Sequence, residues 1–127
     1  MSSIRTWAVT FMIAFCMQAQ AAERLELSEI IASCTGRLSA EMEFAWLMSD
    51  PEADQVEGYR SHFLEILESL GPGEDPRRQM ALRIETKMAH ARLLNTAYFS
   101  PDAARAAWAK RQAFRQRSSC ENLLLDS

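Results

Sequence analysis

The stretch Gly71-Pro72-Gly73-Glu74-Asp75-Pro76 interrupts the chain more strongly than any other and decides how it folds. Its first glycine stands where a helix would end in a left-handed cap. Its aspartate and second proline are typical of a helix start, because proline has no amide hydrogen and fits the first helical turn. Two weaker interruptions, Ser49-Asp50-Pro51 and Ser100-Pro101, lie on either side of it. The three breaks divide the chain into four segments.

Each of these segments has apolar residues at steps of three and four, the spacing of an amphipathic helix. We expect helices over about residues 27–48, 53–70, 76–98 and 101–123. Short connections favour antiparallel neighbours, so the predicted fold is all-α, an antiparallel up-down-up-down four-helix bundle. The predicted inward face of the third helix consists of Met80, Ile84, Met88, Ala91, Leu94 and Tyr98.

Residues 1–21 have the three-part pattern of a secretory signal peptide. Arg5 supplies the positive charge, Thr6–Met17 is an uncharged and mostly apolar stretch, and Ala19-Gln20-Ala21 is a small-x-small cleavage site. The apolar stretch reaches only about 18 Å as a helix, against an apolar bilayer core of roughly 30 Å, so we predict no membrane span. We therefore expect a periplasmic or secreted protein whose single helical domain covers residues 22–127.

Two cysteines, Cys34 and Cys120, remain after this cleavage. An even number of cysteines in an exported protein favours a disulfide. In an up-down-up-down bundle the first and last helices are antiparallel, which brings both cysteines near the same end. We therefore predict a Cys34–Cys120 disulfide, with two free buried thiols as the alternative.

The composition excludes several classes of protein. The chain has 127 residues, of which 48% are hydrophobic, and a formal net charge of -3, which argues against disorder and against nucleic-acid binding. Charge is segregated: residues 22–70 contain eleven acidic and three basic residues, whereas residues 71–127 contain six acidic and ten basic residues. The simplest interpretation is that acidic faces of the first two helices meet basic faces of the last two.

A functional interpretation of the same charges is a basic strip on the last helix, formed by Arg105, Lys110, Arg111, Arg115 and Arg117. Such a strip would meet an acidic exported protein or an anionic component of the cell envelope. Trp108 lies among these residues, and we expect it to be buried beside the neighbouring alanines. An exposed Trp108 would instead serve as an anchor for a partner.

No motif for nucleophilic catalysis or phosphate binding occurs in the sequence. His62 and His90 lack the Glu-x-x-His spacing of di-iron bundles, so we predict no metal site and expect both to be partly exposed helix residues. An alternative that stays open is a b-type haem bound by His90 with Met42 or Met48. The leading prediction has no cofactor and no catalytic residue: a non-catalytic binding or interaction protein.

In the last helix, Trp108, the pair Phe114-Arg115 and Cys120 follow one another in that order. This order resembles the last helix of the small periplasmic lysozyme-inhibitor proteins, which are exported, helical and disulfide-bonded. The aromatic-arginine pair lies three residues further from the tryptophan here than in those proteins, and this chain has fewer cysteines. The resemblance implies an inhibitor of an exported cell-wall hydrolase as a further alternative.

Overall fold

The computed structural model describes the backbone of residues 3–73 and 75–125, and the side chains from residue 20 to 125 except those of residues 21, 22, 25 and 74. Within these ranges the chain forms four α-helices and no strand. The helices are α1 (Ser3–Leu47), α2 (Ala53–Leu70), α3 (Pro76–Phe99) and α4 (Ala103–Leu125). The predicted all-α fold is confirmed.

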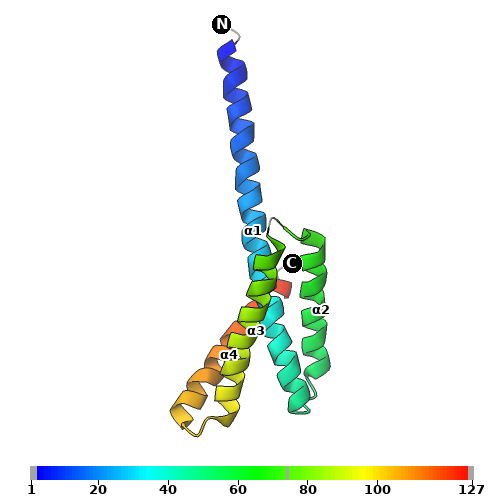
Figure 1. Ribbon diagram of the computed structural model, residues 1–127, viewed down its shortest axis with the longest axis vertical. Helices are drawn as coiled ribbons and strands as arrows, with labels where there is room; N and C mark the ends of the chain where they lie inside the picture. Colours follow the sequence, from blue (N-terminus) through cyan, green and yellow to red (C-terminus); the bar gives the residue numbers. More distant parts are fainter. Residues whose placement is uncertain (1–2, 74, 126–127) are drawn as a thin grey trace.

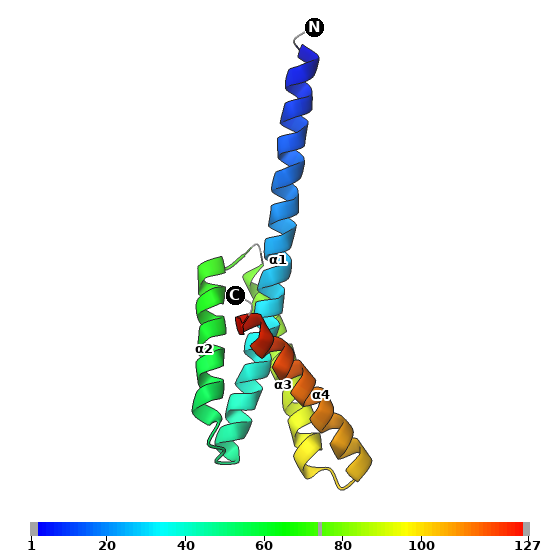
Figure 2. The same ribbon diagram turned by 180° about the vertical axis from the view of Figure 1, so that it is seen from behind.

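The four helices form two antiparallel hairpins, α1–α2 and α3–α4, so the chain direction alternates as predicted (Figures 1 and 2). α1 packs against both α2 and α3, whereas α4 packs mainly on α3 and touches α1 over a short length. The hairpins are in contact near the α2–α3 connection and diverge toward their turns (Figures 1 and 2). This divergence positions the site described below.

α1 begins well before the predicted start near residue 27, and its first half extends beyond the bundle (Figure 1). The sequence explains this, because no glycine or proline interrupts the chain between residues 3 and 35. Nearly all side chains of the predicted signal peptide lie outside the described residues, and its cleavage stays a prediction. Among the residues described, no helix is both long enough and apolar enough to cross a membrane.

The break between α2 and α3 has the predicted aspartate–proline helix start, but Gly71 combines a positive φ with an extended ψ of 178° and so does not form the predicted left-handed cap. Gly71 has a φ of 80° and its N–H donates to the Glu68 carbonyl oxygen, which ends α2. The Asp75 carboxylate accepts a hydrogen bond of 3.0 Å from the backbone N–H of Arg78, and Pro76 is the first residue of α3. A glycine with a positive φ and an aspartate–proline start therefore reverse the chain between the two hairpins.

The core is uneven in the size of its side chains. A larger cluster joins α1, α2 and the end of α4, and consists of Ile31, Ala32, Cys34, Leu38, Met42, Val56, Phe63, Leu67 and Cys120. A smaller cluster joins α1, α3 and α4, and consists of Ala40, Leu94 and Ala113. The first hairpin is thus held by large apolar groups, and the second packs on it mainly through small ones.

A disulfide links Cys34 of α1 to Cys120 of α4, with the two Cα atoms 5.5 Å apart. This confirms the predicted pairing. Both cysteines are buried, and the guanidinium of Arg37 lies 3.8 Å from the Cys120 sulfur. Burial lowers the pKa of Arg37 from its ordinary value. Because α4 makes few other contacts with α1, this bond is the main direct tie between the first and last helices.

α1 and α3 approach each other most closely at Gly36. A Cβ at this position would overlap the Thr86 hydroxyl and the carbonyl oxygen of Arg83. Ala32 and Ala40, four residues before and after Gly36, are also buried. A row of small residues on one side of α1 therefore lets the backbone of α3 pack directly against it.

The predicted inward face of α3 is wrong in part. Met80, Ile84 and Met88 are each at least half exposed, and Tyr98 is 52% exposed. The buried residues of α3 are Leu94, which belongs to the predicted face, and His90, which does not. The physical reason is the way α3 packs on α1. The side of α3 that faces α1 lies against Gly36 and places His90 within hydrogen-bonding distance of Glu41. Residues 80, 84 and 88 lie on the other side of α3 and therefore face solvent.

Candidate functional site

The two hairpins enclose a cleft where they diverge, with a volume of about 290 Å³. Its lining includes Glu41, Phe44, Met48, Glu52, Leu94 and Arg117. A neighbouring hollow shares Glu41, Leu94, Tyr98 and Arg117 with it and adds Phe114 of α4. We call the two together the inter-hairpin cleft.

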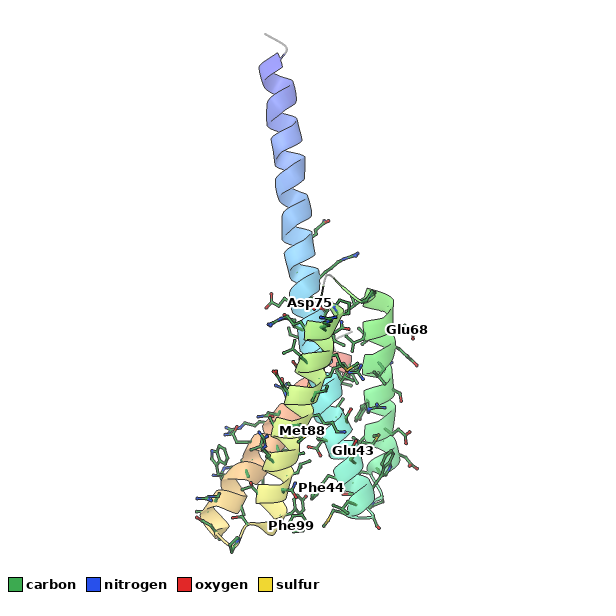
Figure 3. All side chains as sticks on the ribbon, viewed as in Figure 1. Glu43, Phe44, Glu68, Asp75, Met88 and Phe99 are labelled. Carbon is green, nitrogen blue, oxygen red and sulfur yellow. A yellow bond between two sulfur atoms is a disulfide. The ribbon has the colours of Figure 1, made fainter. Side chains whose placement is uncertain are left out.

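Exposed apolar side chains surround the opening of the inter-hairpin cleft. Met48, Tyr98 and Phe114 line it and are 44%, 52% and 69% exposed. The Phe44 ring lies inside, 4.8 Å from the Tyr98 ring and 6.2 Å from the Phe99 ring between centroids. Figure 3 shows Phe44 and Phe99 near the open ends of the hairpins. We call Met48, Tyr98 and Phe114 the cleft rim.

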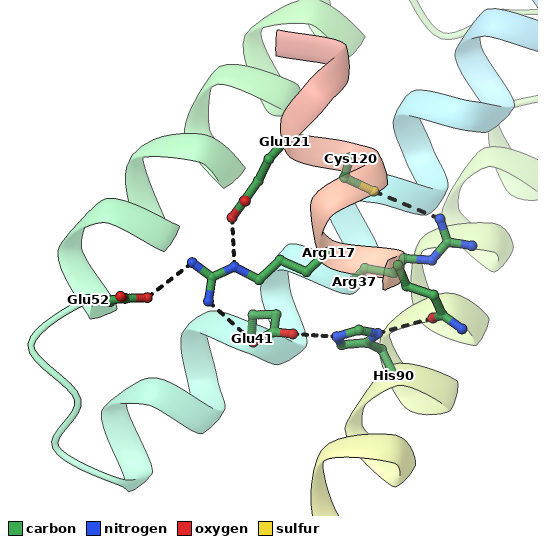
Figure 4. A network of polar contacts seen from close by, with 8 residues as sticks. Arg37, Glu41, Glu52, His90, Arg117, Cys120 and Glu121 are labelled. Carbon is green, nitrogen blue, oxygen red and sulfur yellow. Dashed lines mark hydrogen bonds and ion pairs between the residues drawn. The ribbon is translucent and has the colours of Figure 1, made fainter. Parts of the chain in front are cut away.

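The carboxylate of Glu41, which lines the cleft, belongs to a polar cluster centred on a fully buried histidine, His90. Nε2 of His90 lies 2.6 Å from a carboxylate oxygen of Glu41, and Nδ1 lies 3.2 Å from the side-chain amide oxygen of Gln116 (Figure 4). Because a carboxylate only accepts hydrogen bonds, Nε2 carries the hydrogen in the first contact. These contacts join α1, α3 and α4 at one point.

Arg117 extends this network across the cleft. Its guanidinium lies 2.6 Å from Glu121, 3.2 Å from Glu52 and 4.0 Å from Glu41 (Figure 4). Burial lowers the pKa of Arg117, but hydrogen bonding and attraction to these carboxylates outweigh the burial and raise the pKa overall. Arg117 therefore ties α4 to α1 and to the start of α2 as a charged group.

The structure divides the predicted basic strip of α4 into two sides. Arg117 and Lys110 are seven residues apart and face the cleft, where Lys110 lies 5.9 Å from the centroid of the Tyr98 ring. The other members are exposed on the opposite side of α4 and make no ion pair with a described carboxylate: Arg105, Arg111 and Arg115.

Trp108 lies on the exposed side of α4, and the expectation that it is buried is wrong. Its side chain is 50% exposed, whereas Ala109 and Ala113 are buried. The alanines occupy the side of α4 that packs on α3, because their small side chains allow a close approach. The tryptophan is therefore available to a partner.

Part of the charge segregation serves the contact between the hairpins. Glu29 binds Arg78 and Glu43 binds Lys87, each at 2.5 Å. In every arginine or lysine ion pair between the two hairpins among the described residues, the carboxylate belongs to the first hairpin and the cation to the second. This agrees with the interpretation that acidic faces of the first two helices meet basic faces of the last two. The charged residues on the outer sides of α2 and α4 take no part in these pairs.

The two histidines differ. His62 is exposed, as expected, and lies 3.6 Å from Glu65. His90 is fully buried, so the expectation of partial exposure is wrong for it. Both ring nitrogens of His90 already contact side chains, so a haem bound with Met42 or Met48 would have to break one of these contacts. Across the described ranges, no three histidine, cysteine or acidic side chains are grouped to hold a metal ion.

The sequence prediction missed the inter-hairpin cleft and the polar cluster that includes Glu41. One signal was present: Glu41 lies three residues after Leu38 and four before Ala45, inside the apolar row of α1. A carboxylate at such a position must meet a partner once it is buried. Comparisons of the chain with family models, curated proteins and solved structures found no match.

Proposed function

We propose that the protein is an exported binding module and that the inter-hairpin cleft takes an apolar side chain or short apolar segment of a partner protein. The observation that carries this proposal is the cleft itself, an opening with an exposed aromatic rim above the charged groups of Glu41 and Arg117. Binding sites are commonly apolar hollows with a few fixed polar groups. Exposed apolar patches on a small protein often mark places where proteins meet.

The two parts of the cleft have different roles in this proposal. Tyr98 and Phe114 supply rigid apolar area at low cost in conformational entropy, as aromatic residues do at protein interfaces. Glu41 and Arg117 supply fixed hydrogen-bonding groups that orient what enters. A volume of about 290 Å³ lies at the lower end of ligand sites, which suits one anchoring group better than a large planar cofactor.

Two observations support export. A buried disulfide between residues 86 positions apart is typical of proteins that fold in an oxidising compartment. The first 21 residues have the charge, apolar stretch and small residues of a cleaved signal. Intact mass measured on cell fractions should show a chain that has lost residues 1–21 and has no thiol available for alkylation. A full-length chain in the cytosol with all three of its cysteines, Cys16, Cys34 and Cys120, as free thiols would contradict export.

Selection of peptides from a random library on the purified protein tests the cleft. We expect enriched peptides to carry aromatic or large aliphatic residues. Phe114→Asp and Tyr98→Asp should each weaken their binding by about tenfold or more, because each places a charge where an apolar contact forms. Ile84→Asp is the matched control, since Ile84 is equally exposed but lies on the outer side of α3.

Loss of binding must be separated from loss of folding. For Phe114→Asp and Ile84→Asp we expect a free energy of unfolding within about 0.5 kcal/mol of the wild-type value. Tyr98→Asp also removes the contact with the Phe44 ring, so its free energy of unfolding should fall by about 1 kcal/mol. If Ile84→Asp weakens binding as much as the cleft variants do, or if both cleft variants bind like the wild type, the cleft is not the binding site.

A further inference from the structure

The outer side of α4 carries an exposed line of three arginines and one tryptophan. Arg105, Trp108, Arg111 and Arg115 follow one another at steps of three, three and four residues, which keeps them on one side of the helix. Trp108 is half exposed and the three arginines are exposed. None of these arginines forms an ion pair with a described carboxylate. We call these four residues the α4 basic face.

The neighbours of the α4 basic face neither neutralise it nor obstruct it. Residues 103–120 contain five basic residues and no acidic residue. Ala104 and Ala107 lie beside Trp108 on the same side of α4 and are exposed. Because both are small, neither keeps the indole ring from reaching a partner surface. The face is about 15 Å long, since it extends over ten residues of helix rise.

Charge is distributed unequally between the two sides of the molecule. α2 contains four acidic residues and one basic residue. The four carboxylates of α2 are all exposed: Asp54, Glu57, Glu65 and Glu68. α2 and α4 lie on either side of the lower half of α1 (Figure 2). A negatively charged surface therefore attracts the α4 side of the molecule and repels the α2 side, which orients the protein with α4 toward that surface.

We propose that the α4 basic face binds the surface of a membrane rich in anionic phospholipids, with α4 lying along the headgroups and α2 facing away from them. The arginines pair with the phosphate groups of the lipids. Tryptophan favours the boundary between headgroups and acyl chains, where its ring meets apolar groups and its N–H still finds an acceptor. One indole ring among three guanidinium groups gives a shallow and reversible contact.

Two features of the α4 basic face favour a bilayer over an acidic protein. The face is the convex side of a single helix, and none of its four residues lines the inter-hairpin cleft. A fluid bilayer brings a headgroup to each guanidinium without any match of shape, whereas an acidic protein would need carboxylates at the same spacing. The indole ring stands within the line of charges, and a bilayer offers it an apolar layer directly below the charged one.

Co-sedimentation with lipid vesicles tests this proposal on the protein purified after expression of the full chain. At low salt and lipid concentrations up to about 10 mM, we expect binding to vesicles of equal parts phosphatidylglycerol and phosphatidylcholine. Binding to phosphatidylcholine alone should be at least about tenfold weaker. About 1 M salt, which screens charges beyond about 3 Å, should release the protein. Equal binding to both kinds of vesicle, or no binding to the anionic vesicles, would overturn the proposal.

Charge reversal tests whether the contact lies on α4. Arg111→Glu with Arg115→Glu should weaken binding to the anionic vesicles by about 30-fold or more, because each arginine near an anionic surface contributes roughly fivefold. The matched control is Arg24→Glu with Arg77→Glu, which makes the same change in net charge at exposed positions of α1 and α3. The control should bind within about threefold of the wild type.

An equal loss of binding in the control would overturn the proposal, because binding would then follow net charge and not the α4 basic face. All four substituted arginines are exposed, so circular dichroism should show unchanged helix content in both double variants. The contact is also independent of the inter-hairpin cleft. Arg111→Glu with Arg115→Glu should therefore bind the selected apolar peptides as the wild type does.

Tryptophan emission shows which side of the protein meets the lipid. Trp46 of α1 is as exposed as Trp108, at 51% against 50%, so it is the matched reference. In Trp46→Phe, anionic vesicles should shift the emission to shorter wavelength, because Trp108 enters a less polar environment. In Trp108→Phe the emission should stay where it is. A shift no larger in Trp46→Phe than in Trp108→Phe would overturn the proposed orientation.

Polyaspartate distinguishes a lipid surface from an acidic protein chain. It is added at low salt in an amount that matches the accessible phosphatidylglycerol charge for charge. We expect the protein to stay on the vesicles, because polyaspartate offers Trp108 no apolar layer. Release from the vesicles would show that the α4 basic face prefers an acidic chain and would overturn the proposal.

Discussion

At the end near the α2–α3 connection, the bundle buries large side chains such as Phe63 and Leu67 together with the disulfide. At the opposite end, where the two hairpin turns lie, side chains of similar size are exposed, among them Phe99 and Phe114. The difference follows from the packing of α3, which closes on α1 at Gly36 and then diverges from it.

This difference separates stability from binding. Burial of apolar area and a covalent link stabilise the first end, whereas the second end keeps apolar area in contact with water, where a partner can cover it. Glu41, His90 and Arg117 lie between the two ends and hold the hairpins at a fixed separation. Substitutions at the disulfide end, at the open end and in the cluster between them should therefore differ in how much they change stability and in whether they change binding.

The largest effect is expected from removal of the disulfide by Cys34→Ala with Cys120→Ala. The bond closes a loop over a sequence separation of 86 residues. In the chain-entropy treatment a loop of this length contributes about 4.5 kcal/mol to the free energy of unfolding. Urea unfolding of the variant and of the oxidised wild type measures the loss, and reduced wild type should behave like the variant. A loss below about 1 kcal/mol would show that α4 is held by other contacts.

The next largest effect is expected at Gly36. Gly36→Ala forces the helices apart at their closest contact and should lower the free energy of unfolding by about 3 kcal/mol. Gly58→Ala is the matched control, because Gly58 lies in a helix with open space around it and alanine should stabilise the protein by up to about 1 kcal/mol. Urea midpoints that shift in the same direction for both variants would contradict the close approach of α1 and α3.

A smaller effect is expected at the junction of the two ends. Glu41→Ala leaves the buried N–H of His90 without its acceptor and should cost about 2 kcal/mol of stability. Glu43→Ala removes an exposed carboxylate that pairs with Lys87 on the same two helices and should cost less than about 0.5 kcal/mol. Thermal unfolding compares the two, and equal losses would mean that the buried cluster contributes no more than a surface ion pair.

The boundaries of three helices were predictable because local chemistry sets them. α2 covers the predicted residues 53–70, since Gly71 and Asp75-Pro76 satisfy or remove backbone groups at the break. The start of α1 was not predicted, because no residue with a helix-breaking side chain marks a limit there. The strip on α4 was predicted as one surface but forms two, since Arg117 meets three carboxylates in the cleft.

The sequence by itself determined the helix ends other than the start of α1, the pairing of Cys34 with Cys120 and the separation of acidic from basic residues. These features depend on neighbouring residues or on simple counting. Only the tertiary structure decided which side of α3 is buried, where the hairpins diverge and how Glu41, His90 and Arg117 meet. These depend on contacts between helices, and a row of apolar residues along one helix does not specify which neighbouring helix covers it.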